Sequence, residues 1–240
     1  MLEKVDLTKK ISKEEYKAKM PQMEIELGRL QRECRELKIP VMIVFEGFGA
    51  SGKGVQIGKL IQSMDPRGFQ VFPVKAETEE ERMHPFLWRF WTKTPEAGRI
   101  AIFDGSWYRK VLIDRFEKRT REKEIETAFH SIEAFEKQLT DGGTILVKLL
   151  LDIDQKEQKK RFEKLLEKKE TAWRVSQGDR ERNAKYSEYA AMMEEVLYRS
   201  DTKSAPWTVI EATDRRFATV KIYMTVIHAL AEAVEAVQRR

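Results

Sequence analysis

Cysteine is almost absent from this chain of 240 residues, in which Cys34 is the only one. A single cysteine excludes an intrachain disulfide, which needs a pair. No histidine or second cysteine stands close to Cys34 in the sequence, so nothing there suggests a cysteine-based metal centre. We therefore expect Cys34 to be buried or chemically inert.

Long apolar runs are also lacking. No stretch approaches the length of about 20 apolar residues that a bilayer span requires. Residues 1–10 mix charge and polarity, without the apolar core or cleavage motif of a secretory signal. Internal repeats and low-complexity tracts are absent, and the charged fraction of 35% with 10% aromatic residues is not that of a disordered polymer. The sequence predicts a soluble, cytoplasmic protein with no membrane partner.

The excess of positive charge is small. Lys and Arg number 45 against 40 Asp and Glu, a formal net charge of +5, and without a recognition motif this is a thin basis for nucleic-acid binding. Much of the excess lies in a run with interleaved acidic residues. A solvated helix face is the favoured interpretation of this run, and a polyanion-binding groove is the alternative. The run contains Lys156, Lys159, Lys160, Arg161, Lys164, Lys168 and Lys169.

Five short apolar segments alternate with helical patterns along the chain. Residues 41–45 are an unbroken apolar run, typical of a strand buried on both faces. Segments of the same character lie at 69–74, 99–103, 144–151 and 208–210. Buried strands that alternate with helices predict a parallel sheet. Because the length suits one domain, we expect a single α/β domain over residues 1–240, with three α/β/α layers.

Helical patterns occupy the remaining segments. Ser12 and Glu15 form a capping box that opens a helix running to about residue 37, which Pro21 could divide. Residues 1–40 are therefore expected to form an N-terminal helical extension, and residues from about 155 to 200 a lid with flanking helices. Further helices are predicted at 55–64, from 79 towards 91, at 125–139 and at 217–237.

A glycine-rich segment directly follows the first predicted strand and precedes a predicted helix. It fits the pattern G-x-x-x-x-G-K, in which glycine conformations turn successive N–H groups onto phosphate oxygens and the lysine reaches the transferring phosphoryl group. An ordinary strand-to-helix turn needs neither the lysine nor the spacing. We therefore predict phosphate or nucleotide binding by Gly47, Phe48, Gly49, Ala50, Ser51, Gly52, Lys53 and Gly54.

The metal ligand is expected elsewhere, because Gly54 stands where such loops most often carry a Ser or Thr that binds Mg²⁺. Asp104 ends a buried strand, and a carboxylate there completes the usual shell of Mg²⁺ with phosphate oxygens and water. An alternative is that Asp104 only caps a helix starting near Trp107, and the two roles are compatible. We predict Mg²⁺ as the cofactor and Asp104 as its catalytic ligand.

Four segments in the same order resemble the polyphosphate kinase 2 family. They are Glu46-Gly47 with Gly52-Lys53-Gly54, Phe103-Asp104 with Ser106-Trp107-Tyr108, Trp173-Arg174-Val175, and Ala205-Pro206-Trp207. The resemblance covers most of the chain. It implies a P-loop kinase-like fold with a helical lid, a homo-oligomer, and phosphoryl transfer between inorganic polyphosphate and nucleotides such as AMP and ADP.

Three further segments resemble the first half of the two-domain polyphosphate:AMP phosphotransferases. They are residues 64–69, residues 88–91, and Gly105 before Ser106-Trp107-Tyr108. This closer resemblance implies AMP as the acceptor and a second, homologous domain that this chain does not contain. A stand-alone relative and a fragment of a two-domain protein are both consistent with it.

Two positions depart from the family pattern. Gly49 stands where the family's phosphate loop usually has aspartate, and Gly105 where its second signature usually has arginine. Losing a carboxylate beside the metal and a guanidinium beside the phosphates removes charge stabilisation in the transition state, worth about a few kcal/mol each. A catalytically degenerate domain that binds polyphosphate or nucleotide is therefore the alternative to an active kinase.

Charge neutralisation is assigned to arginines, whose forked guanidinium suits phosphate oxygens. We predict catalytic roles for Arg109 and Arg115 beside Lys53 and Asp104, although a solvent-facing position is equally consistent with each arginine alone. Arg174 follows Trp173 in a polar segment that could close over the site. Trp173 could stack on a purine, but packing within the lid is the favoured interpretation. A small-molecule kinase that uses ATP as donor is a third, less favoured function.

Overall fold

The computed structural model describes residues 1–239, and its centre is a five-stranded parallel sheet. The strand order is β2-β3-β1-β4-β5. The strands are β1 (Val41–Gly47), β2 (Phe69–Pro73), β3 (Ile100–Asp104), β4 (Ile145–Asp152) and β5 (Trp207–Glu211). All five predicted strands are confirmed. Every residue of β1 is buried, as a strand with helices on both faces requires.

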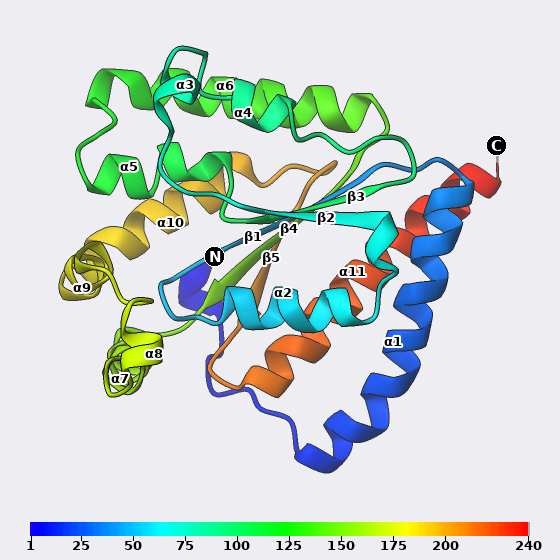
Figure 1. Cartoon of the computed structure of the whole chain (residues 1–240), viewed down its shortest axis with the longest axis horizontal. Helices are drawn as coiled ribbons and strands as arrows, with labels where there is room; N and C mark the ends of the chain where they lie inside the picture. The colour runs from blue at the N-terminus through cyan, green and yellow to red at the C-terminus, as the bar shows by residue number, and fades with distance from the viewer. Residues whose placement is uncertain (240) are drawn as a thin grey trace.

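Helices cover both faces of this sheet, as Figure 1 shows. On one face lie α2 (Lys53–Gln62) and α11 (Arg215–Gln238), and α1 (Lys13–Glu36) packs along α11. On the other face lie α6 (Glu122–Asp141) and α10 (Tyr186–Ser200). The predicted three-layer α/β/α class is therefore confirmed.

Three helices gather beyond the carboxyl ends of the strands, at the left of Figure 1. They are α7 (Gln155–Leu166), α8 (Lys169–Ala172) and α9 (Gln177–Ala184), and with α10 they fill the range in which a lid is predicted. The helix predicted from residue 79 towards 91 is two separate short ones. The short elements are η1 (Leu2–Lys4), η2 (Pro66–Gly68), α3 (Glu79–Arg82), α4 (Trp88–Trp91), η3 (Trp107–Lys110) and α5 (Ile113–Phe116).

Helix α1 begins with Ser12 as its N-cap, as predicted, and the Glu15 amide donates to Ser12 Oγ at 3.0 Å. The reciprocal half of the predicted capping box is not formed among residues 1–239, because the Glu15 carboxylate pairs with Lys19. The helix continues through Pro21 without dividing. Leu27, Leu30 and Cys34 are buried on its inner face, so the expected N-terminal extension is an integral part of one layer. Burial raises the pKa of the Cys34 thiol to about 11, which keeps it protonated and unreactive at neutral pH.

Helix α11 corrects one expectation from the sequence. By length and composition it is long and apolar enough to cross a membrane, although no such stretch is expected. Its apolar side packs against α1, α2, β4 and β5, and Val226 and Leu230 are fully buried. The apolar character of α11 is explained by this core position.

A buried polar network joins the sheet to α6 and α10. The Lys148 ammonium of β4 donates to Glu136 Oε2 at 2.7 Å and to the Ser200 carbonyl at 2.6 Å. The other Glu136 oxygen accepts from Trp107 Nε1 at 2.9 Å and from Tyr108 Oη at 2.5 Å. The network therefore fixes η3, which follows Asp104 directly.

Candidate active site at the carboxyl edge of the sheet

Acidic residues end three of the parallel strands at one edge of the sheet, and a glycine ends a fourth. Gly47 ends β1, Asp104 ends β3, Asp152 ends β4 and Glu211 ends β5. The register pairs Phe45 with Asp104 in β3, so Asp104 lies beside the beginning of the glycine-rich loop. This edge is where open parallel sheets bind ligands.

The glycine-rich loop leads from β1 into α2. Gly47 has φ +141°, and a Cβ there would lie 2.3 Å from the Leu151 carbonyl oxygen, so only glycine fits. Ala50 also has a positive φ of 57°, which is costly for a residue with a side chain. The Lys53 ammonium folds back over the loop and donates to the Gly47 carbonyl at 3.1 Å. The first amides of α2, beginning at Lys53, have no preceding helical turn to accept them.

Two of the predicted phosphate-binding amides already have partners within the protein. The Phe48 N–H donates to the Leu151 carbonyl at 3.2 Å, and the Ser51 N–H to the Phe48 carbonyl at 3.1 Å. The Phe48 ring is buried and stacks on Tyr186, with 4.9 Å between ring centroids. In this conformation the Phe48 and Ser51 amides shape the loop, whereas residues 50–54 border the cavity beside it.

That cavity has a volume of about 830 Å³ and lies between the loop and the α7–α8 segment. Asp104 is its only acidic lining residue among residues 1–239. The basic lining residues come from the loop, from α7 and the segment after it, and from the start of α11. They are Lys53, Arg161, Lys164, Lys168, Arg174 and Arg215. The lining therefore favours a ligand with several negative charges.

Trp173 and Arg174 border the same cavity, as the resemblance of this segment implies. The Trp173 ring is 75% exposed and its Nε1 donates to the Glu170 carbonyl at 2.8 Å. The Arg174 guanidinium lies 5.4 Å from the centroid of that ring. The exposed indole contradicts packing within the lid and leaves one ring face accessible for stacking.

Asp104 is placed as a metal ligand would be. No hydrogen bond or ion pair to its carboxylate is formed within residues 1–239, and a Cβ on Gly54 would lie 4.0 Å from its Oδ2. Mg²⁺ is commonly bound by one or two carboxylates with phosphate oxygens and water, so the absence of a three-ligand cluster in the described part of the chain is compatible with it. Asp104 does not cap η3, because Ser106 is the N-cap residue.

Glu46 is a second carboxylate close to Asp104 and Lys53. It is buried, and the Ser106 hydroxyl donates to its Oε1 at 2.8 Å. Burial raises the pKa of the Glu46 carboxyl, while Lys53 and the Ser106 hydrogen bond oppose that rise. Glu46 therefore lies within electrostatic reach of both Lys53 and Asp104.

The structure places the other two predicted catalytic arginines outside this cavity. Arg109 Nε lies 3.3 Å from Asp114 Oδ1. Arg115 Nη1 lies 2.5 Å from Glu195 Oε2. Both guanidinium groups are mostly buried and bound to carboxylates of α5 and α10, so neither is brought together with Lys53 and Asp104 here. Their catalytic roles stay predictions.

The two departures from the family pattern have distinct surroundings. A Cβ on Gly49 would lie 3.0 Å from Asp179 Oδ1 of α9 and 3.1 Å from the Phe162 ring of α7. Gly105 has φ +74° with nothing closer than 3.6 Å to a Cβ, so its backbone conformation rather than space favours glycine. Each glycine therefore fits its own local structure.

Sequence reasoning missed several residues of the site. Lys164 and Lys168 belong to the basic run for which a solvated face was favoured, and the cavity lining supports the groove instead. Arg161 lies in the same run. No sequence motif marks Arg215 as a site residue, and only its place near the start of the last helix is recognisable. Glu46 belongs to a segment that carries the family resemblance, but no role is predicted for it from the sequence.

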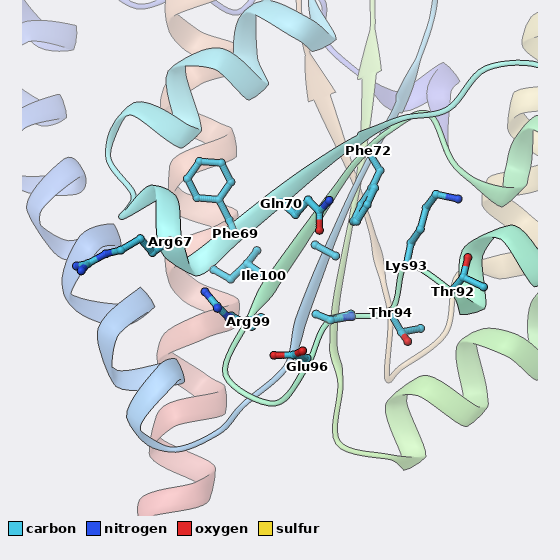
Figure 2. A pocket seen from close by; sticks show the side chains of 12 residues that line it. Arg67, Phe69, Gln70, Phe72, Thr92, Lys93, Thr94, Glu96, Arg99 and Ile100 are labelled. Atoms are coloured by element: carbon cyan, nitrogen blue, oxygen red, sulfur yellow. The ribbon is translucent and has the colours of Figure 1, made fainter.

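A second cavity of about 360 Å³ lies at the opposite end of the sheet, where β2 and β3 begin. Figure 2 shows Gln70 and Phe72 of β2 and Lys93 and Thr94 of the segment after α4 around it. The glycine-rich loop and Asp104 do not border this cavity. It is therefore separate from the candidate active site.

Comparisons with known proteins agree with this geometry. The model of the family described as polyphosphate kinase 2 (PPK2) matches residues 10–238. A polyphosphate:AMP phosphotransferase of Pseudomonas syringae is 36% identical over 97% of this chain and 47% of its own length. An NDP-polyphosphate phosphotransferase of Ruegeria pomeroyi is 31% identical over 90% of this chain and 72% of its own.

Solved structures show the same relation. A polyphosphate kinase 2 structure from Pseudomonas aeruginosa superimposes with a TM-score of 0.93 at 35% identity, over 98% of this chain and 50% of the other. A polyphosphate kinase 2 structure from Arthrobacter aurescens superimposes with a TM-score of 0.91 at 30% identity, over 97% of this chain and 85% of the other. The chain spans about half the length of the phosphotransferases named polyphosphate:AMP that it matches. Because the family model and these relatives match nearly the whole chain, the chain belongs to the polyphosphate kinase 2 family.

Proposed function

We propose that this chain transfers a phosphoryl group between inorganic polyphosphate and a purine nucleotide. The favoured reaction converts polyphosphate and AMP into ADP, and ADP into ATP is a further step of the same kind. The observation that carries the proposal is the cavity in which six basic side chains and one carboxylate surround the loop ending in Lys53. Relatives named polyphosphate:AMP phosphotransferase support the choice of substrates.

Phosphoryl transfer needs positioning and charge neutralisation rather than a protein nucleophile. The Lys53 ammonium, which bonds the Gly47 carbonyl in this conformation, is close enough to the loop to move onto a phosphate held there. Lys164, Lys168, Arg174 and Arg215 neutralise further phosphates of the chain, since each borders the same cavity. A polyanion with one charge per phosphate matches this lining better than a single small anion does.

Mg²⁺ is the proposed cofactor, with Asp104 as the residue that holds it. When bound, the ion neutralises phosphate oxygens and orients them. The Asp104 carboxylate is open toward the cavity, and the loop beside it can hold the phosphate whose oxygens complete the coordination shell of the ion.

Trp173 is the proposed platform for the purine, because its exposed ring lies at the cavity wall. A cytoplasmic homo-oligomer is the proposed state of the protein.

The test is nucleotide formation from polyphosphate and AMP or ADP in the presence of Mg²⁺, followed by chromatography. Lys53→Ala should abolish turnover, because it removes the ammonium that lies on the loop and borders the cavity. A matched control is Lys160→Ala, which removes an exposed ammonium on the same basic run that does not border the cavity. Unchanged turnover in Lys53→Ala would contradict the assignment.

A catalytically degenerate binding domain is the second candidate, favoured by the absence of charge at Gly49 and Gly105. It predicts that polyphosphate or nucleotide binds to the wild-type chain without any product. Calorimetric titration with tripolyphosphate, run beside the turnover assay, separates the two functions. Competition of ATP binding by long-chain polyphosphate further separates both from a kinase that uses ATP as its donor.

A further inference from the structure

Arg161 borders the cavity, yet none of its N–H groups is left for a ligand. A guanidinium has five N–H donors. Its Nε donates to Glu157 Oε1 at 2.7 Å. Its Nη1 donates to the carbonyls of Ala50 at 3.1 Å and Ser51 at 3.0 Å. Its Nη2 donates to the carbonyls of Ala212 at 2.8 Å and Thr213 at 2.9 Å, so five donors meet five acceptors of the protein itself.

The bonds from α7 orient the phosphate loop. Gln158, one turn before Arg161, donates its Nε2 to the Gly49 carbonyl at 3.0 Å. Helix α7 thus holds three successive loop carbonyls, of residues 49, 50 and 51. In a trans peptide the carbonyl of one residue and the N–H of the next point in opposite directions. The amides of Ala50 and Gly52 therefore face away from the α7 side chains that hold these carbonyls.

The same guanidinium also fixes the turn between β5 and α11. Ala212 and Thr213 lie in this turn, and Asp214 then caps α11 by accepting from the Phe217 N–H at 2.7 Å. The next residue, Arg215, borders the cavity. One buried side chain therefore joins the phosphate loop, α7 and the turn that leads into Arg215 at the start of α11.

We propose that Arg161 is a positioning residue, which sets the phosphate loop and Arg215 relative to each other without contacting the bound phosphate chain. This inference rests on the proposed function, because it assumes that the loop binds polyphosphate. The forked shape is essential: an ammonium has only three donors and cannot reach five acceptors in one plane. Arg161→Lys should therefore behave like Arg161→Met, although it keeps the charge.

Lys164 provides the matched comparison on the same helix. It is exposed and borders the cavity one turn further along α7. Within residues 1–239 its ammonium has no carboxylate within ion-pair distance. Lys164 is therefore a direct contact for polyphosphate, whereas Arg161 is not.

The test is calorimetric titration of tripolyphosphate into the wild-type chain and the variants Arg161→Lys, Arg161→Met and Lys164→Met, at several salt concentrations. For polyanion binding, the slope of log affinity against log salt counts the contacts between protein cations and phosphates, at about 0.9 per contact on duplex DNA. We expect both Arg161 variants to lose about tenfold or more in affinity with an unchanged slope. In Lys164→Met, by contrast, the slope of log affinity against log salt should decrease by the amount that one contact supplies.

Two results would overturn the positioning role. A smaller slope in Arg161→Met that Arg161→Lys restores would make Arg161 a direct contact. Unchanged affinity in both Arg161 variants, with wild-type binding intact, would make the side chain merely structural even if the melting temperature falls. If the wild-type chain itself does not bind tripolyphosphate, the proposed function fails first. Should Arg161→Met not fold, Arg161→Gln takes its place.

Discussion

Replacing Asp152 by asparagine should stabilise the protein at neutral and alkaline pH. Asp152 ends β4 and is buried, with its carboxylate close to those of Asp154 and Glu211. No cation pairs with it within residues 1–239. Burial, and next the charges of Asp154 and Glu211, raise the pKa of Asp152 from 3.8 to about 6. Asparagine has nearly the same shape, keeps an acceptor oxygen and never ionises.

The expected gain in stability of Asp152→Asn follows from the linkage between proton binding and folding. Because the pKa is raised in the folded state, the stability that this group contributes is complete below about pH 4 and is lost as the pH rises through about 6. A difference of about two pKa units corresponds to about 3 kcal/mol. Asp152→Asn should therefore gain about 2 to 3 kcal/mol at about pH 8, or roughly 5 to 10 °C in melting temperature for a chain of this size.

The assay is thermal unfolding of the wild-type chain and Asp152→Asn between about pH 4 and pH 8. The difference in melting temperature should grow as the pH rises and should shrink to a small constant at the acidic end. Asp141→Asn is the control, because Asp141 is exposed at the end of α6. A difference that stays constant over this range, or that grows toward acidic pH, would refute the account of Asp152.

Four further substitutions test the two glycines and the buried network. Gly49→Asp should lower the melting temperature without raising turnover, since its Cβ would lie 3.0 Å from Asp179 Oδ1; stronger activity would contradict this. Gly105→Ala should cost about 1 kcal/mol through its φ of +74°, measurable by urea unfolding, and an unchanged midpoint would show that the turn adapts. Lys148→Met should cost about 3 to 5 kcal/mol by leaving Glu136 buried without its cation. Adding Glu136→Gln to Lys148→Met should recover part of this loss, and a double variant no more stable than the single one would be inconsistent with an ion pair.

The fold was predictable where a local pattern carries the information. Strands buried on both faces are continuous apolar runs, and β1 is recognisable from residues 41–45 alone. Ser12 likewise marks the start of α1, because its side chain accepts from the Glu15 amide within the same turn. Pro21 was less informative, because whether a helix continues through proline depends on the packing of the whole helix.

The site was only partly predictable, for a similar reason. Lys53 ends the loop after β1 and Asp104 ends β3, so both are found by motif and position. The partner of Arg115 is Glu195, 80 positions later, and no local pattern indicates that pair. Lys164 and Arg215 meet at one cavity only because α7 and the start of α11 both fold against the loop. Residues united by tertiary structure cannot be found from spacing alone.

Trp173 makes the site observable without a label. The chain has five tryptophans, and among them only Trp173 borders the cavity. Trp107 and Trp207 are buried in the core. A change of intrinsic fluorescence on adding a nucleotide or a phosphate chain would therefore report on this wall of the cavity, with the buried indoles as a steady background. Ligand binding can therefore be followed by the intrinsic fluorescence of the wild-type protein, with Trp173→Phe as the control that lacks the responding indole.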